Sequence, residues 1–511
     1  MFAKVESSAV IGIEPLRVTI EVDVSNGLPD FTIVGLPDTA VRESSERVKA
    51  AIRNSGFDFP AKRITVNLAP ACIKKAGPCF DLPIAIGIMS ATGQIAQENL
   101  TNKIICGELS LDGKVRPING ILPIAIELQR EGLCEFLVPD KNAKEASIVK
   151  QVNIYPLGSL TEAAQLINKQ IDKRPFEADF EKLWQTSQKY TLDFSSVKGQ
   201  EHAKRGLEVA AAGGHNVLMV GPPGSGKTML AKRLPTILGE MTQEEAMETT
   251  KIHSVAGLLS NRKALICTRP FRSPHHTISD AGLVGGGHAP RPGEISLSHN
   301  GVLFLDELPE FKRNVLEVLR QPLEEGTITI TRAMASVAYP ARFMLVAAMN
   351  PCPCGYFTDP KKECHCTPVQ IQRYLSKISG PLLDRIDIHI EVPNLNYKEL
   401  MSRKVHESST DIRKRVNKAR LIQHRRYEKG TFYFNSHINA DEIEKYCRYT
   451  SEGGELLKMA ILELGLSARA YDKVLKIART IADLEGKDDI DAHHISEAIG
   501  YRTLDRNLWT F

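Results

Sequence analysis

Residues 221–228 read Gly-Pro-Pro-Gly-Ser-Gly-Lys-Thr, and this motif constrains the fold more than any other feature of the sequence. The apolar stretch VLMV precedes it at 217–220, and the helical pattern MLAKRL follows it. A strand, a glycine-rich turn and a helix in this order surround a phosphate with backbone N–H groups and the positive end of a helix dipole. A turn without a ligand is the alternative. The predicted phosphate-binding residues are Gly221, Pro222, Pro223, Gly224, Ser225, Gly226, Lys227 and Thr228.

Two later strand ends supply further polar groups for the same site. Asp306 and Glu307 follow the apolar stretch VLFL, and Asn350 follows FMLVAAM. Ligands of parallel sheets bind outside the carboxyl ends of the strands, so these side chains are expected beside the phosphate loop. Lys227 is predicted to contact the β- and γ-phosphates, and Thr228 and Asp306 to hold Mg²⁺. Glu307 would polarise the attacking water and Asn350 would orient it. Acids that cap a helix and an asparagine in a turn are the structural alternatives.

The distribution of apolar residues divides the chain into three parts. Four short apolar stretches alternate with helical patterns, which predicts a parallel sheet covered on both faces: 217–220, 302–305, 343–349 and 388–392. Later segments have helical spacing without strands: 411–428, 439–448, 454–464, 467–485 and 491–500. The first third mixes strand and helix patterns, and a polar stretch follows it. The expected division is a mixed domain at 1–172, a linker at 173–190, an α/β core at 191–396 and a helical domain at 397–511.

Composition excludes several classes of protein. Hydrophobic residues make up 42% of the 511 residues and charged residues 25%, which is typical of globular proteins and not of disordered or fibrous ones. The net charge is +4, so a nucleic-acid-binding surface would have to be local. The start, MFAKVESSAV, lacks the apolar segment of a signal peptide, and no run approaches the roughly 18 apolar residues of a membrane span. We therefore expect a cytoplasmic protein with no membrane partner.

The sequence allows two interpretations of several basic residues, one structural and one functional. Arg385 lies between Asp384 and Asp387, so it forms a local ion pair or reaches the γ-phosphate of a neighbouring subunit. Arg469 in LSARA is an ordinary first-turn arginine or a γ-phosphate contact from the C-terminal helices. The basic residues between 413 and 429 form a solvated helix face or contact nucleic-acid phosphates.

Four cysteines are concentrated in a short segment that follows Asn350. They form two C-x-C pairs: Cys352, Cys354, Cys364 and Cys366. Four thiolates suit tetrahedral Zn²⁺, and His365 offers another ligand. Four reduced thiols, or two disulfides, are the alternatives, although the lack of a secretory signal argues against disulfides. We predict a structural zinc site that stiffens the strand ending at Asn350.

The sequence resembles the magnesium-chelatase-like branch of the AAA+ ATPases, the ComM/YifB family, in three stretches: PFRSPHHTISDAGLVGGGHAPRPGEISLSHNGVLFLDELPEF, NPCPCGYFTDPKKECHCTP and SGPLLDRIDIHIEV. The resemblance extends over essentially the whole chain. It implies a P-loop AAA+ core with a helical lid, ATP and Mg²⁺ as cofactors, and a ring, most often a hexamer. The implied roles are Walker A for Lys227 and Thr228, Walker B for Asp306 and Glu307, sensor 1 for Asn350, arginine finger for Arg385 and sensor 2 for Arg469.

The resemblance also implies DNA contacts and a function. A helix insert is expected at about 272–298, with a flexible pore loop at 282–288 that includes Gly286 and His288. A hairpin is expected at about 327–343, with Arg332 near its tip. The implied activity is an ATP-driven helicase that acts on single-stranded or branched DNA. It would promote branch migration in homologous recombination during natural transformation, alongside other recombination proteins. The alternatives are a remodeller of a protein partner, similar to the magnesium-chelatase motor subunit, and a nucleotide-gated assembly module.

The first 172 residues resemble the Lon protease fold. Cys79 in KAGPCFD stands at the position of the protease nucleophile, but the expected catalytic lysine position reads Leu122. A nucleophile without its general base is not activated. We therefore predict that this domain has no peptidase activity and that Cys79 is a buried structural thiol.

Overall fold

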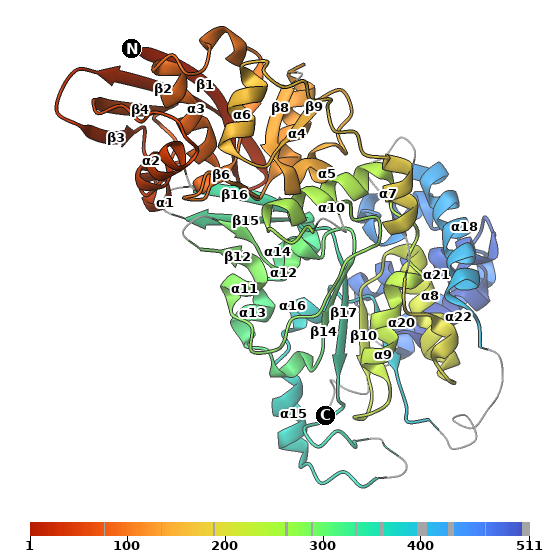
Figure 1. Ribbon diagram of the computed structural model, residues 1–511. Coiled ribbons are helices and arrows are strands. Elements are labelled where there is room, and N and C mark those ends of the chain that lie inside the picture. Colours follow the sequence, from red (N-terminus) through yellow and green to blue (C-terminus); the bar gives the residue numbers. More distant parts are fainter. Residues whose placement is uncertain are drawn as a thin grey trace.

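The structure is a computed structural model. It describes residues 1–75, 77–133, 135–187, 190–260, 264–287, 290–332, 335–357, 359, 362–395, 406–427, 434–464 and 467–502. Figure 1 shows the first third of the chain against one end of a central α/β region, with the C-terminal helices along the side of that region. Within the described ranges, every helix is too short or too polar to cross a bilayer.

The first third forms a seven-stranded mixed sheet in the order β3-β4-β2-β1-β5-β8-β9. Its strands are β1 (Phe2–Ile11), β2 (Glu14–Ser25), β3 (Asp30–Val34), β4 (Arg63–Ala69), β5 (Lys103–Ile105), β8 (Glu135–Pro139) and β9 (Asn153–Leu157). Alternate residues of β2 are buried, as the period-two pattern predicts. The wholly buried helix α3 (Asp81–Ala91) packs on β1 and β2. Gly87 permits this approach, because a Cβ there would lie 2.7 Å from Val22 Cγ2.

Further helices and a small hairpin complete this part. The helices are α1 (Thr39–Arg42), α2 (Ser44–Asn54), α4 (Ile121–Arg130), α5 (Ala143–Ala146) and α6 (Leu160–Ile167), and the hairpin is β6 (Glu108–Leu109) with β7 (Val115–Arg116). The segment expected to be a linker contains a helix, α7 (Phe180–Ser187). Its rings Phe180 and Trp184 stack 5.9 Å apart and pack against the core around α4. This polar segment therefore forms a helix that packs through an aromatic pair at i,i+4, which its composition did not indicate.

The central region contains five parallel strands in the order β11-β14-β17-β10-β18. They are β10 (Val217–Val220), β11 (Phe271–Arg272), β14 (Val302–Leu305), β17 (Met344–Met349) and β18 (Ile388–Glu391). The four predicted strands are confirmed. β11 was missed because two residues with no apolar run give no periodic signal. β10 is first in the chain but lies inside the sheet, and such a change of strand order opens a crevice at the carboxyl edge.

Both faces of this sheet are buried, which explains the continuous apolar strands. Along β10, Val217 and Met219 belong to one core, and Leu218 and Val220 belong to another. The first core includes α8 (Glu201–Gly213) and α9 (Lys227–Arg233), and the second includes α12 (Glu294–Leu297) and α13 (Arg313–Glu317). Three more helices lie on the second side: α14 (Arg320–Glu325), α15 (Pro368–Leu375) and α16 (Gly380–Leu383).

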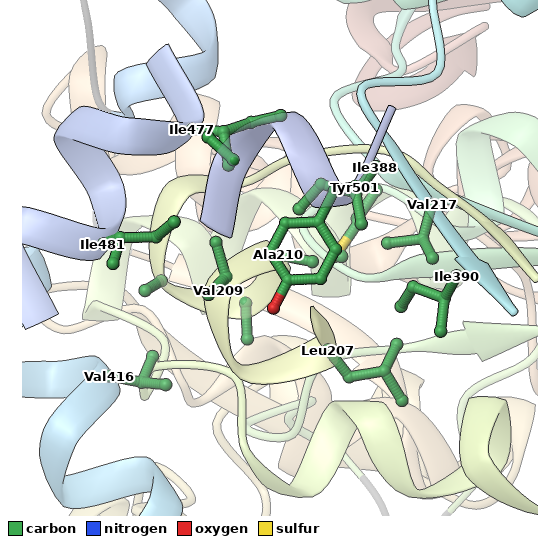
Figure 2. Close-up of a cluster of buried hydrophobic side chains, with 14 of the residues drawn as sticks. Leu207, Val209, Ala210, Val217, Ile388, Ile390, Val416, Ile477, Ile481 and Tyr501 are labelled. Atoms are coloured by element: carbon green, nitrogen blue, oxygen red, sulfur yellow. The ribbon is translucent and has the colours of Figure 1, made fainter. Parts of the chain in front are cut away.

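The C-terminal helices pack on α8 and not as a separate body. They are α18 (Ser409–Tyr427), α19 (Ile443–Tyr446), α20 (Ser451–Leu464), α21 (Ala468–Glu485) and α22 (Ala492–Gly500). Figure 2 shows Ile477 and Ile481 of α21 on one side of α8, and Ile388 and Ile390 of β18 on the other, with the ring of Tyr501 between them. These helices thus share one hydrophobic core with the sheet.

A hairpin of the central region lies directly under the N-terminal sheet (Figure 1). β15 (Thr327–Arg332) pairs antiparallel with β16 (Ala335–Pro340), which confirms the hairpin predicted at 327–343. The β1–β2 turn sits on it so closely that a Cβ at Gly12 would lie 2.0 Å from Val337 Cγ1. The second contact is at the end of α10 (Gln243–Val255), where the Gly120 N–H donates to the Ser254 carbonyl at 3.2 Å. The first third is therefore docked on the central region, and the hairpin and α10 both take part.

The segment 282–288 was predicted to be a flexible loop, and this prediction is wrong for residues 282–284. Residues Asp280–Val284 form α11, and Leu283 is completely buried. The next residues form β12 (Gly285–Gly286), paired with β13 (Arg291–Pro292). A Cβ at Gly285 would lie 2.3 Å from the Arg291 carbonyl oxygen, so this glycine allows close backbone approach and does not confer flexibility. Gly286 is half-buried, and His288 lies outside the described residues.

Candidate nucleotide-binding and hydrolysis site

The phosphate loop joins β10 to α9 at the carboxyl edge of the sheet. Gly221 follows β10 directly, and a Cβ there would lie 2.1 Å from the Val392 carbonyl oxygen. Gly226 caps α9 with a left-handed φ of 95°, which a side chain would strain. Gln200, which the sequence did not single out, holds the loop by donating from Nε2 to the Ser225 carbonyl at 3.3 Å. The loop therefore presents its backbone at a helix N-terminus, as anion binding requires.

Lys227 points into this loop. Its Nζ donates to the carbonyl oxygens of Gly221 and Pro222, at 2.6 and 2.9 Å, and to Asn350 Oδ1 at 3.2 Å. Burial lowers the pKa of Lys227 to about 8, although Asp306 and Glu307 favour its charged form. The ammonium group is thus desolvated and adjacent to the strand end of β17, so phosphate oxygens in the loop would stabilise its charge.

The acidic side of the site begins where β14 ends. Thr228 Oγ1 donates to Asp306 Oδ2 at 2.6 Å, so the two predicted Mg²⁺ ligands lie side by side. Asp306 Oδ1 accepts from the Glu307 N–H at 3.0 Å. A hydroxyl and a carboxylate beside a phosphate loop are hard oxygen ligands, and this donor set fits Mg²⁺. Asn350 reaches the same place from β17, because β17 lies between β14 and β10 in the sheet.

Glu307 has an unusual backbone and an unexpected partner. Its φ is 54°, in the left-handed region that non-glycine residues seldom adopt, and its side chain is 56% exposed. His276 Nδ1 lies 3.5 Å from Glu307 Oε2, and the His276 ring also contacts Phe311 edge-on. His276 belongs to the segment between β11 and α11, 31 residues before Glu307 in the sequence, and no spacing rule indicated this contact. Strained residues of this kind are concentrated at functional sites.

Arg385 and Arg469 lie together but far from the phosphate loop of their own chain. Arg469 Nη1 contacts Asp384 Oδ2 at 3.2 Å, and Arg385 forms an ion pair with Glu324. Burial and the neighbouring cations Arg320 and Arg469 lower the pKa of Arg385. The Nε of Arg385 is buried, with no hydrogen-bond partner in the described part of the chain.

The sheet explains why these arginines are remote from the loop. Asn216, just before β10, donates from Nδ2 to the Arg385 carbonyl at 2.9 Å. Gly221 follows β10 at its other end. The strand between them has four residues, or roughly 13 Å at 3.3 Å per residue. Arg385 therefore lies at the amino edge of the sheet, and the phosphate loop lies at the carboxyl edge.

The structure brings the four clustered cysteines together. The Sγ atoms of Cys352, Cys354 and Cys364 are 3.3 to 3.7 Å apart, and Cys366 completes a group whose ligand atoms all lie within 4.8 Å of one another. All four are free thiols, so the disulfide alternative is not what the structure contains.

Several basic residues of the run at 413–429 make contacts within the protein. Arg415 forms ion pairs with Glu208 and Glu407. Arg420 lies over the Phe434 ring at 4.6 Å. Arg426 pairs with buried Asp483 at 2.6 Å. These three side chains support packing, so the run as a whole is not a free surface for nucleic acid. Arg332 is the last residue of β15, opposite Ala335, and the structure describes only its backbone.

Cys79 and Leu122 occupy positions that disfavour nucleophilic chemistry. Burial raises the pKa of the Cys79 thiol well above its ordinary value, which suppresses the thiolate. Leu122 is completely buried in α4, and its N–H donates to Glu145 Oε1 at 3.0 Å. An apolar side chain at this position supplies no general base.

Comparison with known proteins places this geometry in a family. "Magnesium chelatase, subunit ChlI" matches residues 193–400, "Subunit ChlI of Mg-chelatase" matches 20–142, and "Magnesium chelatase, subunit ChlI C-terminal" matches 406–502. Competence protein ComM of Haemophilus influenzae is 48% identical over 511 residues, covering 99% of this chain and 98% of that protein. Protein YifB of Escherichia coli is 44% identical over 507 residues, covering 99% and 97%. Zygotic DNA replication licensing factor mcm6 of Xenopus tropicalis is 22% identical over 373 residues, covering 68% and 41%.

Nearly full-length identity of this size agrees with the parallel sheet, the phosphate loop and the adjacent Asp306. The chain belongs to the ComM/YifB family of magnesium-chelatase-like AAA+ ATPases.

Proposed function

We propose that this protein is an ATP-driven DNA translocase that acts as a ring, a hexamer by family analogy, and promotes branch migration in homologous recombination. Natural transformation, in the cytoplasm, is the process we assign to it. The similarity to a competence protein supports this assignment, because competence is the state in which a cell takes up DNA. The similarity to a DNA replication licensing factor supports a DNA substrate.

ATP and Mg²⁺ would bind at the phosphate loop. Thr228 and Asp306 would hold the Mg²⁺, which supplies charge neutralisation at the phosphates. Lys227 would stabilise phosphate charge from inside the loop, at the position where its Nζ contacts the loop carbonyls. Glu307 would accept a proton from the attacking water, and Asn350 would orient that water from the neighbouring strand.

The ring is inferred from the separation between the phosphate loop and two arginines of the same chain, Arg385 and Arg469. Arg469 contacts Asp384, the residue next to Arg385, at the amino edge of the sheet, whereas Lys227 and Asp306 lie at the carboxyl edge. An arginine that stabilises the γ-phosphate from the amino edge must therefore serve the nucleotide of another subunit. Head-to-tail contacts of this kind close into rings. We assign Arg385 as the arginine finger and Arg469 as sensor 2, both acting on the neighbour.

The remaining parts have proposed roles in the same assembly. The hairpin β15–β16, with Arg332, and the insert β12–β13, with Gly286 and His288, would contact DNA. The C-terminal helices would form the lid of the AAA+ core. The first third would be a Lon-protease-like scaffold without peptidase activity. Its docking on the hairpin supports a scaffold role, because Gly12 and Val337 are in direct contact.

ATP hydrolysis with and without DNA tests the proposal. We expect stimulation by single-stranded and branched DNA at low salt, and ATP-dependent migration of three- and four-stranded junctions. Glu307→Gln should abolish both while nucleotide still binds. A Glu307→Gln protein that remained active in junction migration would favour a nucleotide-gated assembly module. Absence of any DNA-dependent rate would favour the second candidate, a remodeller of a protein partner, which the three magnesium-chelatase matches support.

A further inference from the structure

The cysteine cluster lies against the nucleotide site and not at a remote surface. Cys352 follows Asn350 by two residues, and it is completely buried in the same core as β17. Figure 1 shows the loop after β17, together with α15, at the carboxyl end of the sheet. Tyr374 of α15 forms a hydrogen bond with the Asn350 backbone and lines the same cavity as Cys354 and Cys366. The loop, the helix and the Asn350 strand end therefore form one packed unit.

The arrangement of the four sulfur atoms fits a tetrahedral metal site. With Zn–S bonds of about 2.3 Å, the edges of a ZnS₄ tetrahedron are about 3.8 Å. The Sγ atoms of Cys352, Cys354 and Cys364 are 3.3, 3.6 and 3.7 Å apart, and Cys366 Sγ lies within 4.8 Å of each of them. A disulfide would require about 2.05 Å. The separations therefore correspond to four thiolates around a common centre.

Backbone groups around the sulfur atoms support the same conclusion. The Phe357 N–H donates to Cys352 Sγ at 3.3 Å, and the backbone of Tyr356 donates to the Cys354 sulfur. Metal-bound ligands are oriented by such outer hydrogen bonds. A cavity of about 560 Å³ beside Cys354 and Cys366 gives an ion a path of entry.

Gly355, between the C-x-C pairs, connects this site to the phosphate loop. A Cβ on Gly355 would lie 2.6 Å from Pro223 Cδ and 3.8 Å from Asn350 Cγ. Pro223 belongs to the phosphate loop, and Asn350 holds Lys227. A movement of the cysteine loop therefore changes the packing of both groups that face the phosphates.

We propose that Cys352, Cys354, Cys364 and Cys366 bind one Zn²⁺ and that this zinc fixes the wall of the nucleotide site, so that zinc binding and nucleotide binding are thermodynamically coupled. The coupling rests on the nucleotide site of the proposed function. It does not depend on DNA binding or on ring formation. Because coupling is reciprocal, nucleotide must strengthen zinc binding by the same factor by which zinc strengthens nucleotide binding.

The test uses the full-length protein and equilibrium binding of a fluorescent ATP analogue, with Mg²⁺ held constant. Untreated wild-type protein should contain about one zinc per chain by elemental analysis. The double variant Cys354→Ser/Cys366→Ser should lose the zinc and bind the analogue at least about fivefold more weakly. Cys72→Ser, at an exposed cysteine outside the cluster, is the matched control and should change neither quantity. Circular dichroism identifies any variant that fails to fold.

A further measurement keeps the coupling testable if the double variant unfolds. In wild-type protein, saturating analogue should reduce zinc transfer to a competing zinc-selective chelator by the same factor. Zinc below about half an equivalent per chain would overturn the metal site. Zinc at full occupancy, with analogue affinity unchanged after its removal, would overturn the coupling. A wild-type protein that does not bind the analogue would instead refute the nucleotide site itself.

Discussion

Removing Arg385 tests the assignment of the hydrolysis site to two subunits. Arg385 lies at the amino edge of the sheet, and the phosphate loop of its own chain begins beyond the far end of β10, roughly 17 Å away for the five residue steps from Asn216 to Gly221. Arg385→Ala should therefore leave nucleotide affinity nearly unchanged. It should lower kcat about 10³-fold or more, the effect of losing an arginine finger, which corresponds to about 4 kcal/mol of transition-state stabilisation.

Mixing two inactive proteins distinguishes action on a neighbour from action within one chain. Arg385→Ala retains Glu307, and Glu307→Gln retains Arg385. Suppose that Arg385 acts on the next subunit. A site is then intact when its phosphate loop and Glu307 come from the Arg385→Ala protein and its arginine comes from the Glu307→Gln protein. Random assembly of an equal mixture makes about a quarter of the sites intact. The mixture should therefore recover up to about a quarter of wild-type ATP hydrolysis.

The assay is steady-state ATP hydrolysis after co-incubation under conditions that allow subunit exchange. Each variant alone at twice the concentration is the control. An arginine that serves its own chain would give no recovery at any mixing ratio, because every chain in the mixture lacks one of the two groups. That result, obtained with exchange demonstrated by labelled subunits, would refute the geometric argument.

Three other outcomes follow from the structure. The pKa of Lys227 is lowered to about 8 by burial, and bound phosphates would raise it, so nucleotide binding takes up a proton above about pH 8. Affinity for a fluorescent ATP analogue should then fall as pH rises above about 8, approaching tenfold per unit, and Lys227→Arg should remove this dependence. His276→Ala should free the Glu307 side chain from its contact with His276 and raise the rate of ATP hydrolysis without DNA about two- to fivefold, which is the size of effect expected from losing an exposed ion pair. An unchanged rate without DNA would show that His276 does not restrain Glu307. Asp483→Asn should lower the free energy of unfolding in urea by about 3–5 kcal/mol, because it leaves buried Arg479 without its counter-charge; a loss below about 1 kcal/mol would contradict this.

Some parts of the candidate site could be predicted because their signals are local. The phosphate loop is contained in eight consecutive residues with a strand before and a helix after. Asp306 and Asn350 could be placed beside it because parallel strands bring their carboxyl ends to one edge. The β15–β16 hairpin was also predicted at its observed position, but from the resemblance to the family and not from a local signal.

Other features depended on contacts between distant segments. His276 and Glu307 lie in different loops between strands of the central sheet, and nothing in the sequence around either residue indicates that they are in contact. Arg420 has the sequence context of a solvated helix face, but the Phe434 ring covers it. The glycines of the expected pore loop suggested flexibility, whereas Gly285 accommodates the Arg291 backbone.

The amino-acid sequence by itself determined the chemistry of the nucleotide site, because glycine, lysine and acidic residues at fixed local spacing have few other uses after a buried strand. Only the tertiary structure decided which groups face that site. The contact of Arg469 with Asp384 places the start of α21 at the edge away from the phosphate loop, and the packing of Gly355 on Pro223 joins the cysteine cluster to that loop. Both outcomes arise from packing between segments distant in sequence, which no short-range pattern encodes.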